Sequence, residues 1–227
     1  MDQVLKEPLF YIFFIYGLSF IVMAFVVLIG IKRATSITLV TTFYTLVIFG
    51  FTHGLTEWID WTRFIIKVTG GDEVRMLVVL SQFFLVVSFV VLLQFGINLL
   101  TYRNEKKSFI RSVPVLLLAL YIAALLIAGV NDFMKAGLIA RRSFGFAGSL
   151  LSGIALFRLS GSMKLTGNSR LVKGLAVTAV GFVSYAVFGG LIINPVAGLP
   201  VQLFRAACAL TIAASSFSIL GVFEAGR

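Results

Sequence analysis

The chain contains a single histidine, His53, and an acidic residue, Glu57, follows it four positions later. In a helix this spacing places both side chains on one face. An imidazole beside a carboxylate can exchange a proton, and an unperturbed imidazole titrates near neutral pH. The pair therefore predicts an ionisable site that senses pH or a small ligand, or that relays protons.

The residues that follow the pair are aromatic and acidic: Trp58, Asp60 and Trp61. Two interpretations remain open for them. Tryptophans and acids commonly form a belt at the boundary between membrane and water. Trp58 and Trp61 could instead belong to the same site as His53 and contact its ligand.

Three arginines, Arg141, Arg142 and Arg205, lie at or near the start of two apolar stretches. An arginine near the apolar part of a membrane usually has a partner. We therefore expect a network in which Glu57 pairs with Arg142 or Arg205, with His53 just beneath it. The alternative is that the long arginine side chains extend to the lipid headgroups.

Other chemistries have less support in the sequence. Cys208 is the only cysteine and cannot form a disulfide within the chain, and His53 with Glu57 offers two ligands where a tight metal site needs three or four. We find no Ser-His-Asp spacing, phosphate-binding loop or nucleotide motif. No lysine lies in the middle of an apolar run, which argues against a retinal Schiff base. We therefore expect no metal, no cofactor and no enzymatic activity, and an intramembrane enzyme ranks third among the possible functions.

The composition indicates the class of protein that holds these residues in place. Hydrophobic residues make up 59% of the chain and charged residues 12%, with a mean hydropathy of +1.06. Soluble domains have about 25% charged residues. The net charge of +10 falls in short basic clusters between apolar runs, which favours a membrane protein over a nucleic-acid-binding one.

Seven apolar runs are long enough to cross a bilayer, which takes about 20 residues. The runs are continuous rather than alternating, so they predict helices and not a β-barrel. We expect an all-α membrane protein, a bundle of seven transmembrane helices in one domain spanning 1–227. The expected helices are about 9–31, 37–61, 74–102, 113–130, 133–159, 171–193 and 201–222.

Loop charges predict the orientation. The segments after the first, third and fifth runs are basic, for example Lys32 and Arg33, while the opposite ends are nearly balanced. By the positive-inside rule the N-terminus lies outside and the C-terminus in the cytoplasm. Phe223 and Glu224 suit a helix that continues into the cytoplasm.

Small and amide side chains predict how the helices pack. Gly50 and Gly54 form a Gly-xxx-Gly surface, and a second small-residue face begins at Gly145. Such faces allow helices to approach closely in a membrane. Gln94 and Asn98, one turn apart, are expected to hydrogen-bond between helices.

Three motifs together resemble the seven-helix N-terminal input modules of bacterial membrane sensor proteins. They are His-Gly-Leu-Thr-Glu-Trp at 53–58, Arg-Arg-Ser-Phe-Gly at 141–145, and Gly-Leu-Pro-Val-Gln-Leu-Phe-Arg at 198–205 before a helix ending in Val-Phe-Glu. The resemblance implies that five residues belong to a family pattern: His53, Glu57, Arg142, Gln202 and Arg205. It also implies a homodimer in the bacterial inner (cytoplasmic) membrane, joined in the same polypeptide to a histidine kinase or diguanylate cyclase. The chain itself carries no ATP-binding motif, cyclase signature or phosphoacceptor histidine in a cytoplasmic helix.

The expected function is therefore that of a sensory input domain. A stimulus at an outward-facing polar cluster would shift the seventh helix and pass the signal to a cytoplasmic output. The ligand is not identified by the residues. The alternative is a small transporter or channel with His53 and Glu57 as a proton relay, although the chain shows no inverted repeat and little polarity in its predicted cytoplasmic half.

Overall fold

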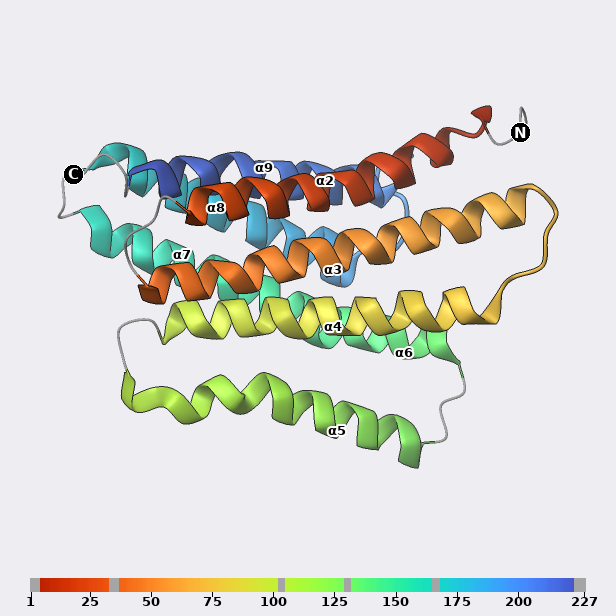
Figure 1. The fold of residues 1–227 in the computed structure, drawn as a ribbon, viewed down its shortest axis with the longest axis horizontal. Helices are drawn as coiled ribbons and strands as arrows, with labels where there is room; N and C mark the ends of the chain where they lie inside the picture. The colour runs from red at the N-terminus through yellow and green to blue at the C-terminus, as the bar shows by residue number, and fades with distance from the viewer. Residues whose placement is uncertain (1–4, 33–36, 102–104, 129–131, 165–167, 223–227) are drawn as a thin grey trace.

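The computed structural model describes residues 5–32, 37–101, 105–128, 132–164 and 168–222. Within these ranges the long secondary-structure elements are all helices, and they run along the long axis of the molecule (Figure 1). The expected all-helical class is confirmed for the described residues. The elements are α2 (Pro8–Ile31), α3 (Ile37–Val68), α4 (Arg75–Leu100), η1 (Glu105–Ser112), α5 (Val113–Ile127), α6 (Phe133–Ala140), η2 (Arg141–Gly145), α7 (Phe146–Met163), α8 (Ser169–Tyr185), η4 (Ala186–Leu191) and α9 (Val201–Val222).

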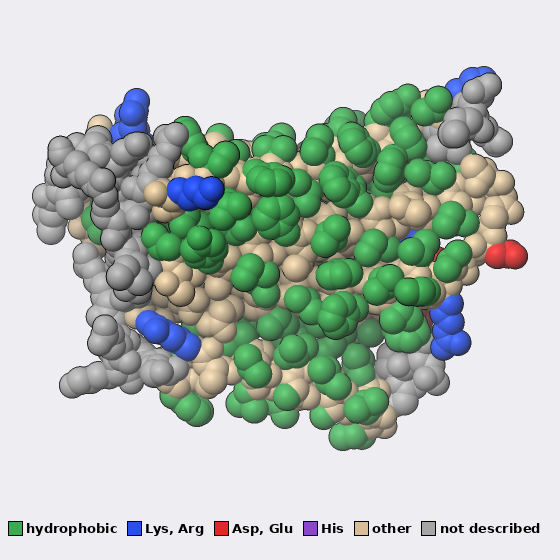
Figure 2. Space-filling view, viewed as in Figure 1, with side chains coloured by type: hydrophobic (Ala, Val, Ile, Leu, Met, Phe, Trp, Pro, Cys, Tyr) green, Lys and Arg blue, Asp and Glu red, His purple; other side chains and the backbone are tan. Residues whose placement is uncertain are grey.

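Five of the helical segments in the described chain are long and apolar enough to cross a membrane. They are Pro8–Ile31, Arg75–Leu100, Phe109–Ile127, Phe133–Met163 and Ser169–Leu191. Helix α9 adds a shorter apolar stretch, Val201–Phe217. Hydrophobic side chains cover the middle of the face seen in Figure 2, and lysines and arginines lie toward its two ends. The protein thus has the surface and the helices of a membrane protein.

Six helices form a closed ring. Helix α2 packs against α3 and α9, α3 against α4, α4 against α7, α7 against α8, and α8 against α9. Helix α5 lies outside this ring, beside α4 (Figure 1). The ring has an interior to which each of its helices contributes side chains, and that interior holds the functional site.

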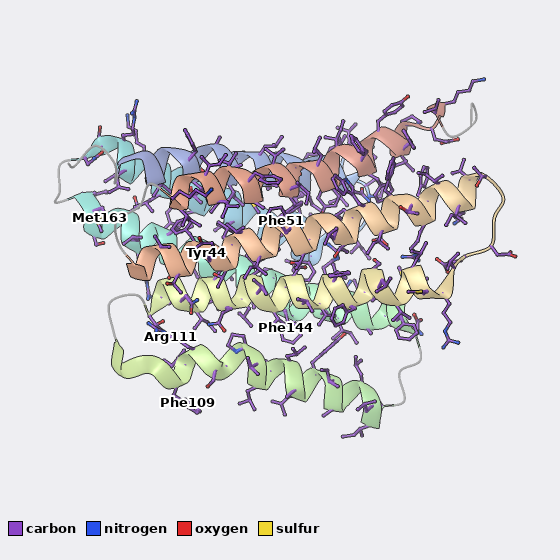
Figure 3. The ribbon with its side chains drawn as sticks, in the orientation of Figure 1. Tyr44, Phe51, Phe109, Arg111, Phe144 and Met163 are labelled. Atoms are coloured by element: carbon purple, nitrogen blue, oxygen red, sulfur yellow. The ribbon has the colours of Figure 1, made fainter. Side chains whose placement is uncertain are left out.

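Helix α5 is covered very little by the rest of the protein. Pro114 is its buried residue, whereas Leu126 and Ile127 are 77% and 88% exposed. Phe109, just before α5, projects away from the ring and is 79% exposed (Figure 3). So much apolar surface on one helix calls for lipid or another protein around it.

Small residues bring the helices of the ring into close contact, as the sequence predicts. A Cβ atom added to Gly148 of α7 would lie 2.7 Å from the backbone nitrogen of Leu93 in α4. A Cβ on Gly54 would lie 3.1 Å from the carbonyl oxygen of Gly17, between α3 and α2. The expectation for the amides was wrong, because Gln94 donates to Asn98 at 2.8 Å along α4 rather than across helices.

The second apolar run was expected to end near residue 61, but α3 continues to Val68. Arg63 and Lys67, which we expected in a loop, are helical. Arg63 donates to Asp60 one turn earlier and to Glu73 beyond the helix, and these ion pairs support the extra turns. The expected continuation of the last helix at Phe223 and Glu224 lies outside the described residues.

Two of the predicted helices contain a π-helical turn, which sequence patterns do not reveal. The long helix of residues 133–163 is π-helical at η2, and residues 169–191 end in the π-helical η4. The two turns pack against each other. A π turn holds one more residue than an α turn, so it shifts which side chains face inward, and such turns are frequent at functional sites.

Candidate functional site

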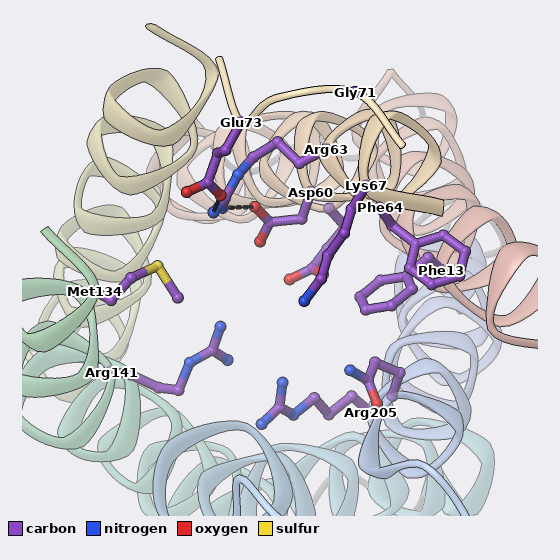
Figure 4. Close-up of a pocket in the computed structure, with 12 residues that line it drawn as sticks. Phe13, Asp60, Arg63, Phe64, Lys67, Gly71, Glu73, Met134, Arg141 and Arg205 are labelled. Atoms are coloured by element: carbon purple, nitrogen blue, oxygen red, sulfur yellow. Dashed lines mark hydrogen bonds and ion pairs between the residues drawn. The ribbon is translucent and has the colours of Figure 1, made fainter. Parts of the chain in front are cut away.

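A cavity of about 520 Å³ opens at the end of the ring where α3 connects to α4 (Figure 4). Its walls come from the ends of α2, α3, α6 and α9 together with η2. Twelve residues line it: Phe13, Glu57, Asp60, Arg63, Phe64, Lys67, Gly71, Glu73, Met134, Arg141, Gln202 and Arg205. Seven of the twelve carry an ionisable charge, which is unusual inside a bundle of apolar helices.

His53 lies beneath this cavity and is fully buried. Its Nδ1 is 3.0 Å from the hydroxyl oxygen of Ser88. That hydroxyl donates its one proton to the carbonyl oxygen of Leu85, 2.8 Å away, so it can only accept from His53. The geometry therefore assigns the proton of the neutral imidazole to Nδ1.

The other imidazole nitrogen, Nε2, is then an acceptor. The hydroxyl of Tyr185 donates to it over 2.8 Å, and the hydroxyl of Tyr16 is 3.4 Å away. Both tyrosines are buried, on α8 and α2 respectively. Four helices thus fix the position and tautomer of His53.

Glu57 lies between His53 and the cavity. Its side chain is 4% exposed, and its Oε1 is 3.5 Å from Nε2 of His53. This oxygen has no hydrogen-bond partner among the described residues. A neutral Nε2 and an ionised carboxylate are both acceptors, so the contact becomes a hydrogen bond only when a proton resides on one of them. The pair is therefore a site for one proton.

Two arginines on the opposite side of the cavity are bound to backbone carbonyls. Arg205, 5% exposed, donates from Nε to Phe188 at 2.6 Å and from Nη2 to Ile192 at 2.8 Å. Arg141 donates from Nη1 to Gly189 at 3.2 Å. These carbonyls lie at the C-terminal end of α8–η4, where free carbonyls and the helix dipole favour a cation.

The expected ion pair between Glu57 and an arginine is not present among the described residues. Glu57 is paired with His53, and Arg205 is bound to the backbone. Arg142 is exposed and does not line the cavity, whereas its neighbour Arg141 does. Both arginines belong to the π turn η2, and its different register decides which of the two faces inward.

Of the remaining predicted site residues, one lines the cavity and two do not. Gln202 lines the cavity beside Arg205. Trp58 and Trp61 do not. Trp58 stacks on Phe14 of α2 and donates from Nε1 to the Phe14 carbonyl at 3.4 Å, and Trp61 packs against the same ring at a tilted angle. The two tryptophans therefore join α3 to α2 and do not form the cavity wall.

The mouth of the cavity is a small charged cluster of its own. Asp60 accepts from Ser81 at 2.7 Å and from Arg63 at 2.8 Å, and Arg63 also pairs with Glu73. Lys67 lies at the same rim and is exposed. Arg63 is thus matched by two carboxylates before any ligand arrives.

Sequence reasoning missed three residues that hold His53: Tyr16, Ser88 and Tyr185. The available signal was that each places a hydroxyl inside an apolar run. That signal is weak, because serine often satisfies itself within a helix and tyrosine is common in membrane helices. Only the ring arrangement shows that the three hydroxyls converge on one imidazole.

Among the described residues, no group of three His, Cys, Asp or Glu side chains is placed to hold a metal ion. The comparisons with known proteins add no assignment: no family model matches the chain, and neither the curated proteins nor the solved structures contain a match. The chemistry of the cavity and of the His53–Glu57 pair beneath it is therefore the basis on which a function can be proposed.

Proposed function

We propose that the protein is a seven-helix sensory input domain of a bacterial inner membrane, with the cavity as its sensing site. Five helices are apolar enough to cross a membrane; four of them form the ring together with α3 and α9, and the fifth, α5, lies beside it. The basic segments of the sequence favour an orientation in which the cavity faces outward. The ligand would then enter from the outer side of the membrane.

The observation that carries this proposal is that the cavity is closed beneath His53. Phe20, Phe49 and Phe89 surround the imidazole, with ring centroids 4.5–5.3 Å from it. Further along the ring, Phe95 packs against Phe43 and Phe182. All six phenylalanines are at most 1% exposed. A polar cavity with an aromatic floor suits binding, whereas transport requires a path to the other side.

Helix α9 connects the cavity with the opposite end of the molecule. Gln202 and Arg205 near its start line the cavity, and the helix, Val201–Val222, packs against α2 and α8. A ligand shifts such a helix only if it binds two arrangements of the bundle with different affinity. Arg205 is the residue through which ligand binding would change the position of α9.

The two π turns are suited to provide the second arrangement. A π turn that reverts to α-helical geometry advances the following helix by one residue, which is about 1.5 Å and 100° of rotation. Turn η2 carries Arg141, and η4 carries the carbonyls that hold both arginines. A ligand that draws the arginines away from those carbonyls would favour the change.

The output of the proposed sensor is cytoplasmic. The resemblance of three motifs to sensor input modules favours a histidine kinase or diguanylate cyclase in the same polypeptide, working as a homodimer. In that arrangement α9 would continue toward the output domain.

A proton transporter or channel is the second candidate, and the His53–Glu57 pair is the observation that favours it. The pair is a site for one proton beneath an open cavity. The aromatic floor argues against passage of that proton to the other side. The two functions differ in whether protons cross the membrane or only reach His53.

The two functions can be tested with a fusion of the full chain to a cytoplasmic histidine kinase core. The fusion protein is reconstituted in liposomes that contain a pH-sensitive dye. We expect autophosphorylation to change when the outer pH is stepped between about 5.5 and 7.5, with no dye response inside. His53→Ala should abolish this change, and Thr52→Ala, at the preceding position, should preserve it. Proton entry without a change in kinase activity would assign the protein to the transporters.

A further inference from the structure

We propose that the ligand of the cavity is a small organic monocarboxylate, bound by Arg141 and Arg205, with its apolar part against Phe13 and Phe64. This inference names the ligand class of the proposed sensing site and so rests on that function. Both arginines extend into the open space in Figure 4, across the cavity from Asp60 and Arg63.

The two guanidinium groups have unused donors. Arg205 uses Nε and Nη2 for the backbone and keeps Nη1, and Arg141 uses Nη1 and keeps Nη2, among the described residues. Two backbone bonds hold the planar group of Arg205 in one orientation, and one backbone bond together with the ring of Phe89 restricts that of Arg141. Fixed guanidinium groups bind carboxylates well, because their N–H donors match the two carboxylate oxygens and little flexibility is lost.

The charges around the cavity are uneven. At the rim, Arg63 is paired with Asp60 and Glu73. Deeper in, Arg141 and Arg205 form no ion pair with any described carboxylate, and the cation–π contact of Arg141 with Phe89, at 5.4 Å, compensates little of its charge. An anion placed between the two arginines would supply the missing counter-charge where water is scarce.

Shape and the position of Glu57 narrow the class of anion. The volume of about 520 Å³ lies in the range of small-molecule sites. Phe13, Phe64 and Met134 give part of the wall an apolar surface. Glu57 belongs to the same cavity, and its carboxylate would repel a dianion such as phosphate more strongly than a monoanion. A carboxylate with an apolar body fits these three conditions together.

Calorimetric titration of the full chain in nanodiscs of zwitterionic lipid tests the proposal. The probes are phenylacetate, its neutral counterpart phenylacetamide, and inorganic phosphate. We expect phenylacetate to bind and the other two to bind at least about tenfold more weakly, since a charge-assisted hydrogen bond contributes enough for that ratio. Equal binding of phenylacetamide, or preferred binding of phosphate, would overturn the proposal.

The chain offers a matched pair of variants for the same titration. Arg141→Gln and Arg142→Gln remove the same charge from adjacent positions of η2, but only Arg141 lines the cavity. Phenylacetate affinity should fall about tenfold or more in Arg141→Gln and stay within about twofold in Arg142→Gln. If Arg141→Gln does not fold, Arg141→Lys keeps the charge without the planar donors and should still weaken binding several-fold. Equal affinities in the 141 and 142 variants would contradict the site.

Two further experiments are needed. The first distinguishes a soluble acid from a lipid headgroup as the ligand, and the second distinguishes failure of the ligand proposal from failure of the sensor proposal. In nanodiscs containing phosphatidylserine, loss of phenylacetate binding would assign the carboxylate to a lipid headgroup, and unchanged binding to a soluble acid. Arg141-dependent binding with no effect of phenylacetate on the kinase fusion would leave the ligand class standing and contradict the sensing role. A kinase response to pH with no carboxylate binding would do the reverse.

Discussion

The ring has two halves that meet at His53 and are stabilised differently. In the cavity half, toward the α3–α4 connection, charged side chains line an open space and bind backbone carbonyls or each other. In the closed half, on the other side of His53, buried phenylalanines and small residues fill the interior. Residues of the closed half therefore mainly determine stability, and those of the cavity half are available to a ligand.

The two halves differ most clearly in what lies between neighbouring helices. Backbone contacts at Gly148 and Gly96 leave no room for a methyl group between α4 and α7. In the cavity half, the π turn η4 instead leaves carbonyls that arginines occupy. A bundle whose one half is tightly packed and whose other half holds cations on the carbonyls of a π turn can respond at one end without unfolding at the other.

The largest expected effect comes from a methyl group added in the closed half. Gly148→Ala should destabilise the protein by about 1–3 kcal/mol, because the new Cβ would lie 2.7–3.0 Å from backbone atoms of Leu93 and Leu92, which cannot rotate away. Gly161→Ala, near the end of the same helix, is the matched control. A Cβ there meets nothing within 4 Å, so alanine should be neutral or stabilise by up to about 1 kcal/mol.

Unfolding of both glycine variants by SDS in mixed micelles, followed by circular dichroism, measures the difference. Two variants of equal stability would show that the closed half is not tightly packed, and the contrast between the halves would fail.

A smaller effect is expected at the boundary between the halves. Tyr185→Phe removes the hydroxyl that donates to His53 Nε2 at 2.8 Å and should cost about 1–2 kcal/mol, because a buried acceptor loses its better partner. Tyr16→Phe should cost less, since its hydroxyl is 3.4 Å away. Thermal unfolding in detergent compares the two.

The tautomer of His53 is tested with a different variant, Ser88→Ala. The chain has one histidine, so a nitrogen-15 spectrum of the labelled protein shows a single imidazole. The wild-type signal should carry its proton on Nδ1, and Ser88→Ala should remove that preference. A proton on Nε2 in the wild type would contradict the assignment through Ser88 and Leu85.

The smallest expected effect lies outside the membrane, at the rim of the cavity half. Asp132 caps α6, and hydrogen bonds from the backbone N–H groups of Lys135 and Met134 lower the pKa of its carboxyl group below the usual value. A lowered pKa in the folded state means that Asp132 contributes stability above its unfolded pKa, near 3.9, and that this contribution is lost as pH falls through the folded pKa.

Asp132→Asn should therefore lower stability slightly at pH 7, and the difference from wild type should shrink as the pH falls below about 3.9, the usual carboxyl value. Asp72→Asn, which removes a charge from the exposed α3–α4 connection but no helix cap, is the control. Thermal unfolding from pH 7 down to pH 3 follows both. A gap between Asp132→Asn and wild type that widens on acidification would reverse the sign and rule out the capping explanation.

Local patterns predicted much of the arrangement. The i and i+4 spacing of His53 and Glu57 placed both on one face, and both are buried with 3.5 Å between them. Apolar runs predicted the helices, because a helix that crosses a bilayer needs about 20 mostly apolar residues. Patterns of glycine predicted close contacts at Gly54 and elsewhere, because only small residues permit them.

The errors share a cause, which is that they depend on register or on distant partners. Arg142 was favoured over Arg141, and the π turn that reverses this choice leaves no mark in the residue types. Glu57 was expected to pair with Arg142 or Arg205, but the guanidinium group of Arg205 donates to the carbonyls of Phe188 and Ile192 instead. Backbone acceptors are the same at every position, so no sequence pattern distinguishes the ones that a fold leaves free.

The sequence by itself determined that this chain forms apolar helices, that its basic residues fall in clusters between the apolar runs, and that His53 and Glu57 lie together. Those properties depend on composition and on helical spacing, which are local. Only the tertiary structure decided that Tyr185 and Ser88 fix the tautomer of His53, that Arg141 and not Arg142 faces the cavity, and that phenylalanines close its floor. Each of these depends on which helices are neighbours and on how each is rotated about its axis, which long-range packing alone determines.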